Sequence, residues 1–217
     1  MYLLPTIFRL APLVYESSST IDKQVIIYPG RFQPFHRGHA SVYHYLCDKH
    51  SNADVYIATS GVVDPVKSPF TFDQKRQMML FAGIPDNAIV HVKNPYVAQE
   101  IMSKYDASRT GLMFAISQKD MESDPRFAFR LKKDGSQPYL QPLKTTEPEQ
   151  SAAHHGYMTT IPTLSFKVNG VMVNSASQIR EQYKRATAKE RKRIIFDLYG
   201  KLSPEIESIF DQALTAN

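Results

Sequence analysis

The feature that most constrains the fold is a short apolar run at 25–28, followed by a tight loop and then by a helical pattern. The β-branched residues from Val25 to Tyr28 predict a strand, and Pro29-Gly30 ends it. From His36 to Lys49 the apolar residues recur at helical spacing. A strand, a tight loop and a helix in this order are typical of the first unit of an α/β domain.

The same alternation continues along the chain. We expect further strands at Asp54–Thr59, Ile89–Val92 and Leu112–Ser117, and helices at Phe72–Phe81 and Val97–Tyr105. Alternating strands and helices imply parallel strands joined by right-handed crossovers. The predicted fold class is therefore α/β, with a doubly wound, mainly parallel sheet.

The second half of the chain is less regular. Periodicity fails from 118 to 155, and a stretch of this length is a functional flap, an insertion with a small hairpin, or a mobile loop. A last strand is expected at Leu164–Val168, with a hairpin through Asn169-Gly170. A helix opening near Ser177 and C-terminal helices within 188–217 complete the expected domain, which covers residues 22–217; the two C-terminal helices are placed at Lys189–Tyr199 and Pro204–Ala213.

Residues 1–21 are expected to form an N-terminal arm. Proline and arginine residues at 5, 9 and 12 interrupt its apolar character, which argues against a secretory signal. The arm could pack on its own domain, in a homo-oligomer, or in a larger assembly. No apolar stretch approaches the roughly 18 residues that span a bilayer, so no membrane partner is expected. A single cysteine, Cys47, favours a reducing compartment such as the cytoplasm.

The charge balance suits a protein that handles phosphates. The net charge is +5, and the window 180–193 holds seven cations and two anions, a balance of 7 − 2 = +5. A solvated helix face is the simplest interpretation of this window. Tyr183 is its only aromatic residue, which is unlike a base-stacking platform, so nucleic acid is not an expected partner.

The segment YPGRFQPFHRGH is the main candidate for chemistry. In open α/β sheets, ligands bind beyond the carboxyl ends of the strands, which is where this segment begins. Gly30 allows a sharp turn and a close approach of the backbone to a phosphate. His36 and His39 are three residues apart, so both imidazoles should project from one side of the helix start. Ordinary structural histidines and metal ligands are the alternatives. No HExxH motif or complete tetrahedral ligand set supports a metal site.

A second candidate cluster is SASQIR at 175–180. Ser177 is expected to be the N-cap of a helix whose free N–H groups bind an anion, with Ser175 beside it and Arg180 one turn on. Serine caps followed by arginine are common, so this pattern becomes informative only together with the first cluster.

Together the two clusters resemble the HxGH nucleotidylyltransferase superfamily, through HRGH and SASQIR, with serine at 177 where threonine is usual. The longer match GRFQPFHRGH is most similar to the archaeal-type nicotinamide mononucleotide adenylyltransferases and their relatives in large tailed phages. SPFTFDQKRQMM also resembles the NPFT-x-x-x-R segment of that group. This correspondence puts Arg76 at the family's arginine and Ser68 where asparagine is usual.

The resemblance implies a Rossmann-like nucleotidyltransferase fold. It implies transfer of AMP from ATP, with Mg²⁺ carried by the triphosphate, to a small-molecule phosphate acceptor. His36 and His39 would contact the triphosphate and be the catalytic residues. The nucleotide-binding residues would be Gly30, Arg31, Phe32, Gln33, Ser175, Ser177 and Arg180, and the acceptor contacts would be Lys67 and Arg76.

Three functions follow as expectations. The first is adenylyl transfer to nicotinamide mononucleotide (NMN), forming NAD and pyrophosphate. The second is cytidylyl transfer to an alcohol phosphate, because HxGH is shared by both classes. The third is a phage structural or assembly protein built on the same fold. A phage-encoded chain would work in the host cytoplasm or reside in the virion.

Overall fold

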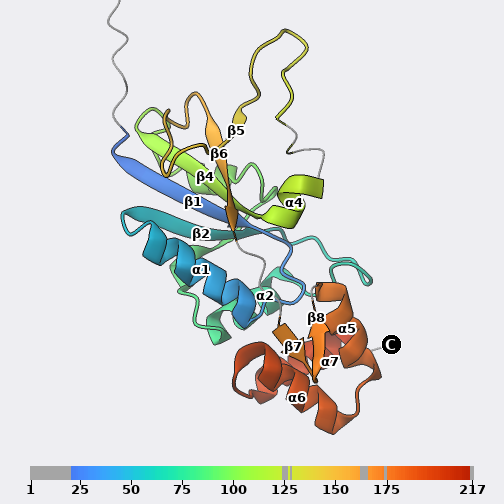
Figure 1. The fold of residues 1–217 in the computed structure, drawn as a ribbon. Helices are drawn as coiled ribbons and strands as arrows, with labels where there is room; N and C mark the ends of the chain where they lie inside the picture. The colour runs from blue at the N-terminus through green and yellow to red at the C-terminus, as the bar shows by residue number, and fades with distance from the viewer. Residues whose placement is uncertain (1–20, 124–126, 128, 162–165, 174, 216–217) are drawn as a thin grey trace, which may run out of the picture.

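The computed structural model describes residues 21–123, 127, 129–161, 166–173 and 175–215. The expected arm therefore lies outside the described residues, apart from Ile21. The main feature is a six-stranded parallel sheet, which confirms the predicted fold class (Figure 1). Its strands are β1 (Lys23–Pro29), β2 (Ala53–Thr59), β3 (Ile89–His91), β4 (Thr110–Ser117), β5 (Leu140–Pro142) and β6 (Gly156–Ile161).

The strand order is β3-β2-β1-β4-β6-β5, so the winding reverses between β1 and β4. Both of these strands are buried on both faces, as expected of parallel strands covered by helices. Val25, Ile26 and Ile27 of β1 are fully buried. The reversal point is where ligands bind in doubly wound sheets. The apolar run that predicted the first strand therefore occupies the centre of the sheet.

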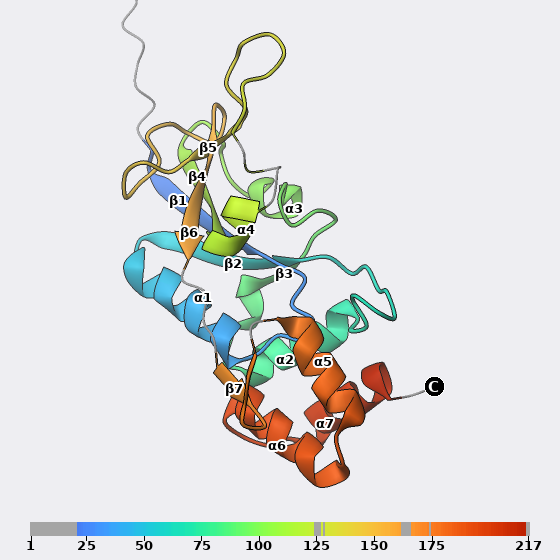
Figure 2. The same ribbon diagram turned by 45° about the vertical axis from the view of Figure 1, so that its right-hand side comes forward.

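Helices cover both faces of the sheet (Figures 1 and 2). One hydrophobic cluster joins one face to α1 (Arg37–Lys49) and α2 (Phe72–Phe81). A second cluster joins the other face to α3 (Gln99–Met102) and to residues of the 118–155 segment. A 3-10 turn, η1 (Asp86–Ala88), leads into β3. No helix among these described residues is long and apolar enough to cross a membrane.

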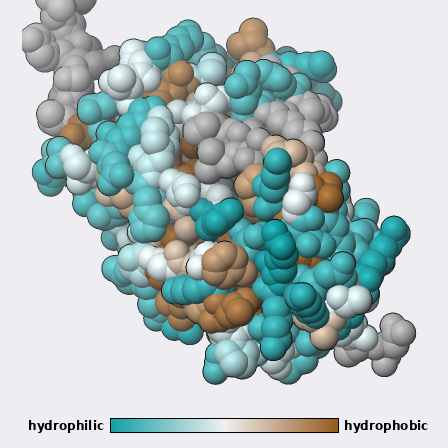
Figure 3. Space-filling model, turned by 60° about the horizontal axis from the view of Figure 1, so that its bottom comes forward, coloured by the Kyte–Doolittle hydropathy of each residue, from teal (hydrophilic) through white to brown (hydrophobic). Residues whose placement is uncertain are grey.

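The C-terminal part forms a block beside α1 and α2 (Figures 1 and 2). It contains an antiparallel hairpin, β7 (Phe166–Val168) with β8 (Val171–Val173), and three helices: α5 (Ala176–Arg185), α6 (Ala188–Tyr199) and α7 (Pro204–Leu214). Each helix begins with a hydroxyl N-cap, and Gly200 ends α6 in the left-handed conformation that favours glycine. Figure 3 looks onto this end of the molecule and shows a mostly hydrophilic surface with small apolar patches.

Several expected elements differ from the structure. The strand β6 was not expected, yet it pairs with β4 inside the main sheet. The expected last strand at 164–168 corresponds to β7 (Phe166–Val168), and residues 164 and 165 of that prediction lie outside the described part of the chain. The predicted hairpin through Asn169-Gly170 is confirmed. Helix α3 (Gln99–Met102) is only one turn long, shorter than the expected Val97–Tyr105, and it begins after Ala98, which is in the left-handed conformation. The 118–155 segment contains α4 (Gln118–Ser123) and the parallel edge strand β5, which takes the place of the small hairpin.

Candidate functional site

A cavity of about 690 Å³ lies at the carboxyl ends of β1 and β4, at the point where the strand order reverses. Residues far apart in the sequence line it: Tyr28, Pro29, Gly30, Arg31, Phe32, Gln33, His39, Lys67, Tyr96, Ala115, Ile116, Ser117, Asp120, Ile161, Ser175, Ala176, Ser177 and Arg180. A second cavity of about 700 Å³ is walled mostly by apolar side chains of α3 and of the 118–155 segment. Convergent polar groups distinguish a reactive site, so the first cavity is the candidate site.

The two histidines lie together at the start of α1. Their ring centroids are 3.8 Å apart, and only His39 lines the cavity. His36 is the N-cap of α1, and its Nδ1 accepts a hydrogen bond from the Gly38 N–H at 3.1 Å. Phe166 also packs against the His36 ring, at 4.7 Å between centroids. His36 therefore supports the helix start and its neighbour, while His39 faces the ligand space.

Both imidazoles are uncharged at neutral pH. Burial lowers the pKa of His39 from 6.5 to about 3. Burial lowers the pKa of His36 well below its usual range, with smaller contributions from His39 and Arg37. Because Nδ1 of His36 accepts a hydrogen bond, its neutral ring carries the proton on Nε2. The buried Nδ1 of His39 has no partner among the described residues. His39 therefore offers a neutral donor rather than a positive charge.

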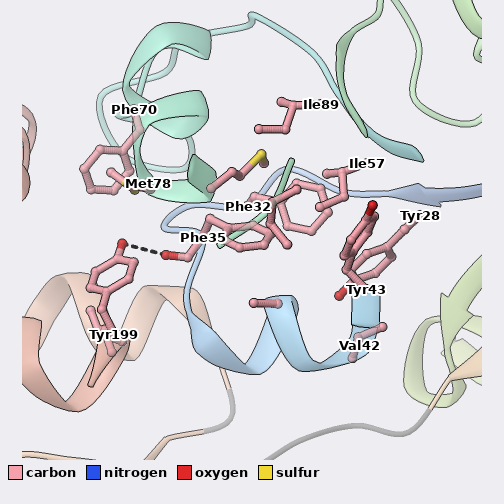
Figure 4. Packing of buried hydrophobic residues seen from close by; sticks show 14 of the residues in the cluster. Tyr28, Phe32, Phe35, Val42, Tyr43, Ile57, Phe70, Met78, Ile89 and Tyr199 are labelled. Carbon is pink, nitrogen blue, oxygen red and sulfur yellow. Dashed lines mark hydrogen bonds between the residues drawn. The ribbon is translucent and has the colours of Figure 1, made fainter. Parts of the chain in front are cut away.

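The loop after β1 turns at Phe32 rather than at Gly30. Phe32 has a φ of 49°, whereas Gly30 continues the pairing with β2 by donating its N–H to the Ala58 carbonyl oxygen at 3.1 Å. Glycine is still required at this position, since a Cβ on Gly30 would lie 2.6 Å from the Phe32 ring. The ring of Phe32 packs edge-on against Tyr28 (Figure 4) and against the imidazole of His39. The expected sharp turn is thus present two residues later than predicted.

Arg180 connects α5 to two loops at the mouth of the cavity. It is 8% exposed, and its guanidinium donates to the carbonyl oxygens of Gln33 at 2.7 Å and Val66 at 3.0 Å. Burial lowers the pKa of Arg180, and the nearby Arg31 lowers it further. Two cations that raise each other's electrostatic energy favour an anion between them.

The N-cap of α5 is Ser175 and not Ser177, so the predicted cap is wrong by two residues. The Ser175 hydroxyl accepts from the Gln178 N–H at 3.4 Å and lies 3.1 Å from the Ser177 hydroxyl. Ser177 therefore stands within the first turn. Both hydroxyls line the cavity, as the SASQIR pattern predicted.

Lys67 also lines the cavity, at the end of a tight turn. The carboxylate of Asp64 accepts hydrogen bonds from the N–H groups of Val66 at 2.9 Å and Lys67 at 2.6 Å. Asp64 and Ser68 also exchange two backbone hydrogen bonds of 2.9 Å. This turn presents the Lys67 side chain from a fixed backbone.

Arg76, an expected substrate contact, is not among the residues that line the cavity. Its guanidinium pairs with Asp86 at 2.6 Å on the surface of α2. Lys75, one residue earlier, points inward: it is 1% exposed, and its ammonium donates to the Thr59 hydroxyl at 2.7 Å and the Ser60 carbonyl oxygen at 2.6 Å. The NPFT-x-x-x-R spacing, counted from Thr71, also falls on residue 75.

Several lining residues were not predicted. Ser117 and Asp120 belong to the end of β4 and the start of α4, where the Ser117 hydroxyl donates to the Asp120 carboxylate at 2.8 Å. Tyr28, at the end of β1, has its pKa raised by burial and by Asp120. Ser117 and Asp120 could have been predicted, because they follow the carboxyl end of the strand beside β1, where ligands bind in such sheets. Tyr96, on the loop before α3, has no comparable position in the sequence pattern.

The described residues contain no group of three or more His, Cys, Asp or Glu side chains that could hold a metal ion. The basic window 180–193 is also divided in the structure. Arg180 is buried at the cavity, Arg191 pairs with Asp211 at 3.1 Å, and Arg185 lies 3.5 Å from Glu181. These pairings leave less uncompensated charge on the surface than the sequence balance indicated.

Comparisons with known proteins identify a family and a similar fold. A family model described as cytidylyltransferase-like matches residues 27–182. A nicotinamide-nucleotide adenylyltransferase from Thermococcus sibiricus (strain DSM 12597 / MM 739) is 27% identical over 99 residues, covering 39% of this chain and 53% of the relative. The structure of a bifunctional NMN adenylyltransferase/ADP ribose pyrophosphatase from Francisella tularensis aligns with a TM-score of 0.52 and 17% identity, covering 90% of this chain and 51% of that chain. The chain thus spans about half the length of these relatives, and the structural likeness concerns the fold.

Proposed function

Because the chain belongs to the cytidylyltransferase-like family, we propose that it is a nucleotidyltransferase that transfers AMP from ATP to nicotinamide mononucleotide. The observation that carries this proposal is the convergence of His39, Arg31 and Arg180 on one cavity. The similarity to a nicotinamide-nucleotide adenylyltransferase supports ATP as donor and NMN as acceptor.

In the proposed reaction, a phosphate oxygen of NMN attacks the α-phosphorus of ATP, and the bond from that phosphorus to the bridging oxygen breaks. Pyrophosphate leaves with the electron pair, and NAD forms. Such transfers depend mainly on positioning and on stabilising charge at the phosphate oxygens. His39 donates a hydrogen bond to these oxygens without proton transfer. Arg31, Lys67 and Arg180 supply positive charge, and Ser175 and Ser177 supply hydroxyl donors to the outer phosphates. His36 supports His39 by packing against its ring.

We place Mg²⁺ with the substrate, because ATP carries this ion on its phosphates. Asp120 brings carboxylate oxygens to the same cavity, where they can accept hydrogen bonds from hydroxyl groups of the substrates. The acceptor phosphate requires cations on the other side of the reacting phosphorus. Lys67 stands on a separate turn from Arg31 and Arg180, and we propose that it contacts both the triphosphate and the acceptor phosphate.

A substrate screen tests this proposal. The purified chain is incubated with Mg²⁺, with ATP or CTP, and with NMN or an alcohol phosphate, and released pyrophosphate is measured. We expect release with the pair ATP and NMN, together with NAD in the product. The description of the family model motivates CTP and an alcohol phosphate as the second pair. Release with that pair alone would replace the proposed substrates, and no release with any pair would contradict nucleotidyl transfer.

A further inference from the structure

The side-chain amide of Gln33 forms hydrogen bonds through both its nitrogen and its oxygen to the backbone of one residue on another loop. Its amide nitrogen donates to the Phe70 carbonyl oxygen at 2.9 Å, and its amide oxygen accepts from the Phe70 N–H at 2.9 Å. Gln33 is 3% exposed. The Gln33 side chain therefore forms a two-bond link between the loop after β1 and the segment that leads into α2.

The backbone of Gln33 is also held. Its carbonyl oxygen accepts from Arg180 of α5, and the same guanidinium donates to the Val66 carbonyl oxygen. The turn that carries Lys67 is thus fixed at both ends, through Val66 by Arg180 and through Phe70 by Gln33. Gln33 is the residue at which the three segments around the cavity mouth meet.

We infer that Gln33 is a positioning residue, which sets the separation between the His39 side of the cavity and the turn that carries Lys67, and so fixes the site for the triphosphate. This inference rests on the proposed function, because it assumes that the cavity binds ATP. A bidentate amide link resists both sliding and rotation of one loop against the other. Without it, the cations on the two loops would no longer be held at a fixed distance, and ATP would bind more weakly.

The chemistry of the link provides a specific test through Gln33→Glu. An ionised carboxylate keeps the acceptor for the Phe70 N–H but loses the donor, and it places negative charge against the Phe70 carbonyl oxygen. A protonated carboxylic acid has one O–H donor and one acceptor and restores both bonds. Burial raises the pKa of a carboxyl at this position, which brings the change into an accessible pH range.

The experiment measures the ATP affinity of the folded full chain by calorimetry in the presence of Mg²⁺, at about pH 8 and about pH 5.5. Wild type is measured at each pH, so that titration of ATP cancels in the ratio. We expect Gln33→Glu to bind ATP about tenfold more weakly at the higher pH, and to approach wild type at the lower pH. Gln33→Met, which can form neither bond, should be weaker by a similar factor at both pH values.

Gln74→Glu is the matched control, because the Gln74 side chain accepts from the Thr71 N–H in a capping box where glutamate serves equally well. It should bind ATP like wild type at both pH values. A folded Gln33→Glu that matches wild type at the higher pH, or an equal loss at both pH values, would overturn the inference. If Gln33→Glu does not fold at the higher pH, wild-type affinity in Gln33→Met would overturn it. A wild-type chain that binds ATP but does not adenylylate NMN contradicts the proposed function and leaves this inference standing.

Discussion

At the scale of single residues, the site combines uncharged imidazoles with buried cations. His39 remains neutral because burial disfavours the charged form of its ring and lowers its pKa to about 3. Lys75 is buried as well, and its hydrogen bonds go to a hydroxyl and a carbonyl oxygen rather than to a carboxylate. Burying an ammonium without a carboxylate partner costs free energy of folding. Lys75 is such a group, and it lies next to the end of β2.

The pKa of Lys75, lowered by burial from 10.5 to about 8, predicts a pH dependence of stability. The unfolded chain binds a proton at Lys75 up to about pH 10.5, whereas the folded chain releases it near pH 8. The free energy of unfolding should therefore rise with pH between these values, by up to about 3 kcal/mol from this residue.

Lys75→Met removes that titration. Denaturant unfolding of both proteins across this pH range should show the stability of wild type, relative to the variant, increasing toward high pH. A difference between wild type and Lys75→Met that stays constant from pH 8 to 10.5 would show that Lys75 is not buried as a cation.

At the scale of elements, the C-terminal helices hold the loop that carries the histidines. The Tyr199 hydroxyl of α6 donates to the Phe35 carbonyl oxygen at 2.7 Å, and both residues are buried (Figure 4). Together with the hydrogen bond from Arg180 to Gln33, this contact fixes two carbonyl groups of the loop between β1 and α1. Helices α5 and α6 are therefore parts of the site and not an appendage.

Tyr199→Phe tests this role, because it removes one donor and leaves the packing of the ring intact. The Phe35 carbonyl oxygen then stays buried without that partner, so the free energy of unfolding should fall by about 1–3 kcal/mol. Tyr45→Phe on the exposed side of α1 is the control, with an expected change within about 0.5 kcal/mol. Denaturant unfolding measures both variants, and equal stabilities would show that the contact with Phe35 contributes nothing.

The elements that could be predicted are those whose own residues show a local pattern, such as an apolar run, helical spacing or a capping motif. The apolar run of β1 and the helical pattern of α1 were sufficient to place the histidines at a strand end, and SASQIR was sufficient to place serines and arginine near a helix start. Strand β6, GYMTTI, was missed although its tyrosine, threonines and isoleucine favour a strand, because its pairing with β4 is a long-range contact. The hydrogen bonds of Gln33 and Arg180 were missed because they join residues far apart in the sequence. A local sequence pattern does not predict the partner of such a side chain.

At the scale of the whole molecule, the site exists only in the complete fold. The cavity takes residues from the ends of β1 and β4, from the turn before α2 and from the start of α5. The strand order β2-β1-β4 places the ends of β1 and β4 side by side. Arg180 of α5 then links the loop after β1 to the turn before α2 through its two hydrogen bonds. We propose that this assembled cavity holds a triphosphate while His39 stabilises the transfer of its α-phosphate.

The most direct test follows labelled phosphates of ATP during a single turnover with NMN, in wild type, His39→Asn and the surface control His44→Asn. Label at the α-phosphate should enter NAD, and label at the γ-phosphate should leave in pyrophosphate. His39→Asn should slow this step by about 10²–10³-fold, because the shorter amide does not place its donor where the imidazole N–H lies, while His44→Asn keeps the wild-type rate. Transfer by His39→Asn at the wild-type rate, or α-label that leaves as ADP, would contradict the account.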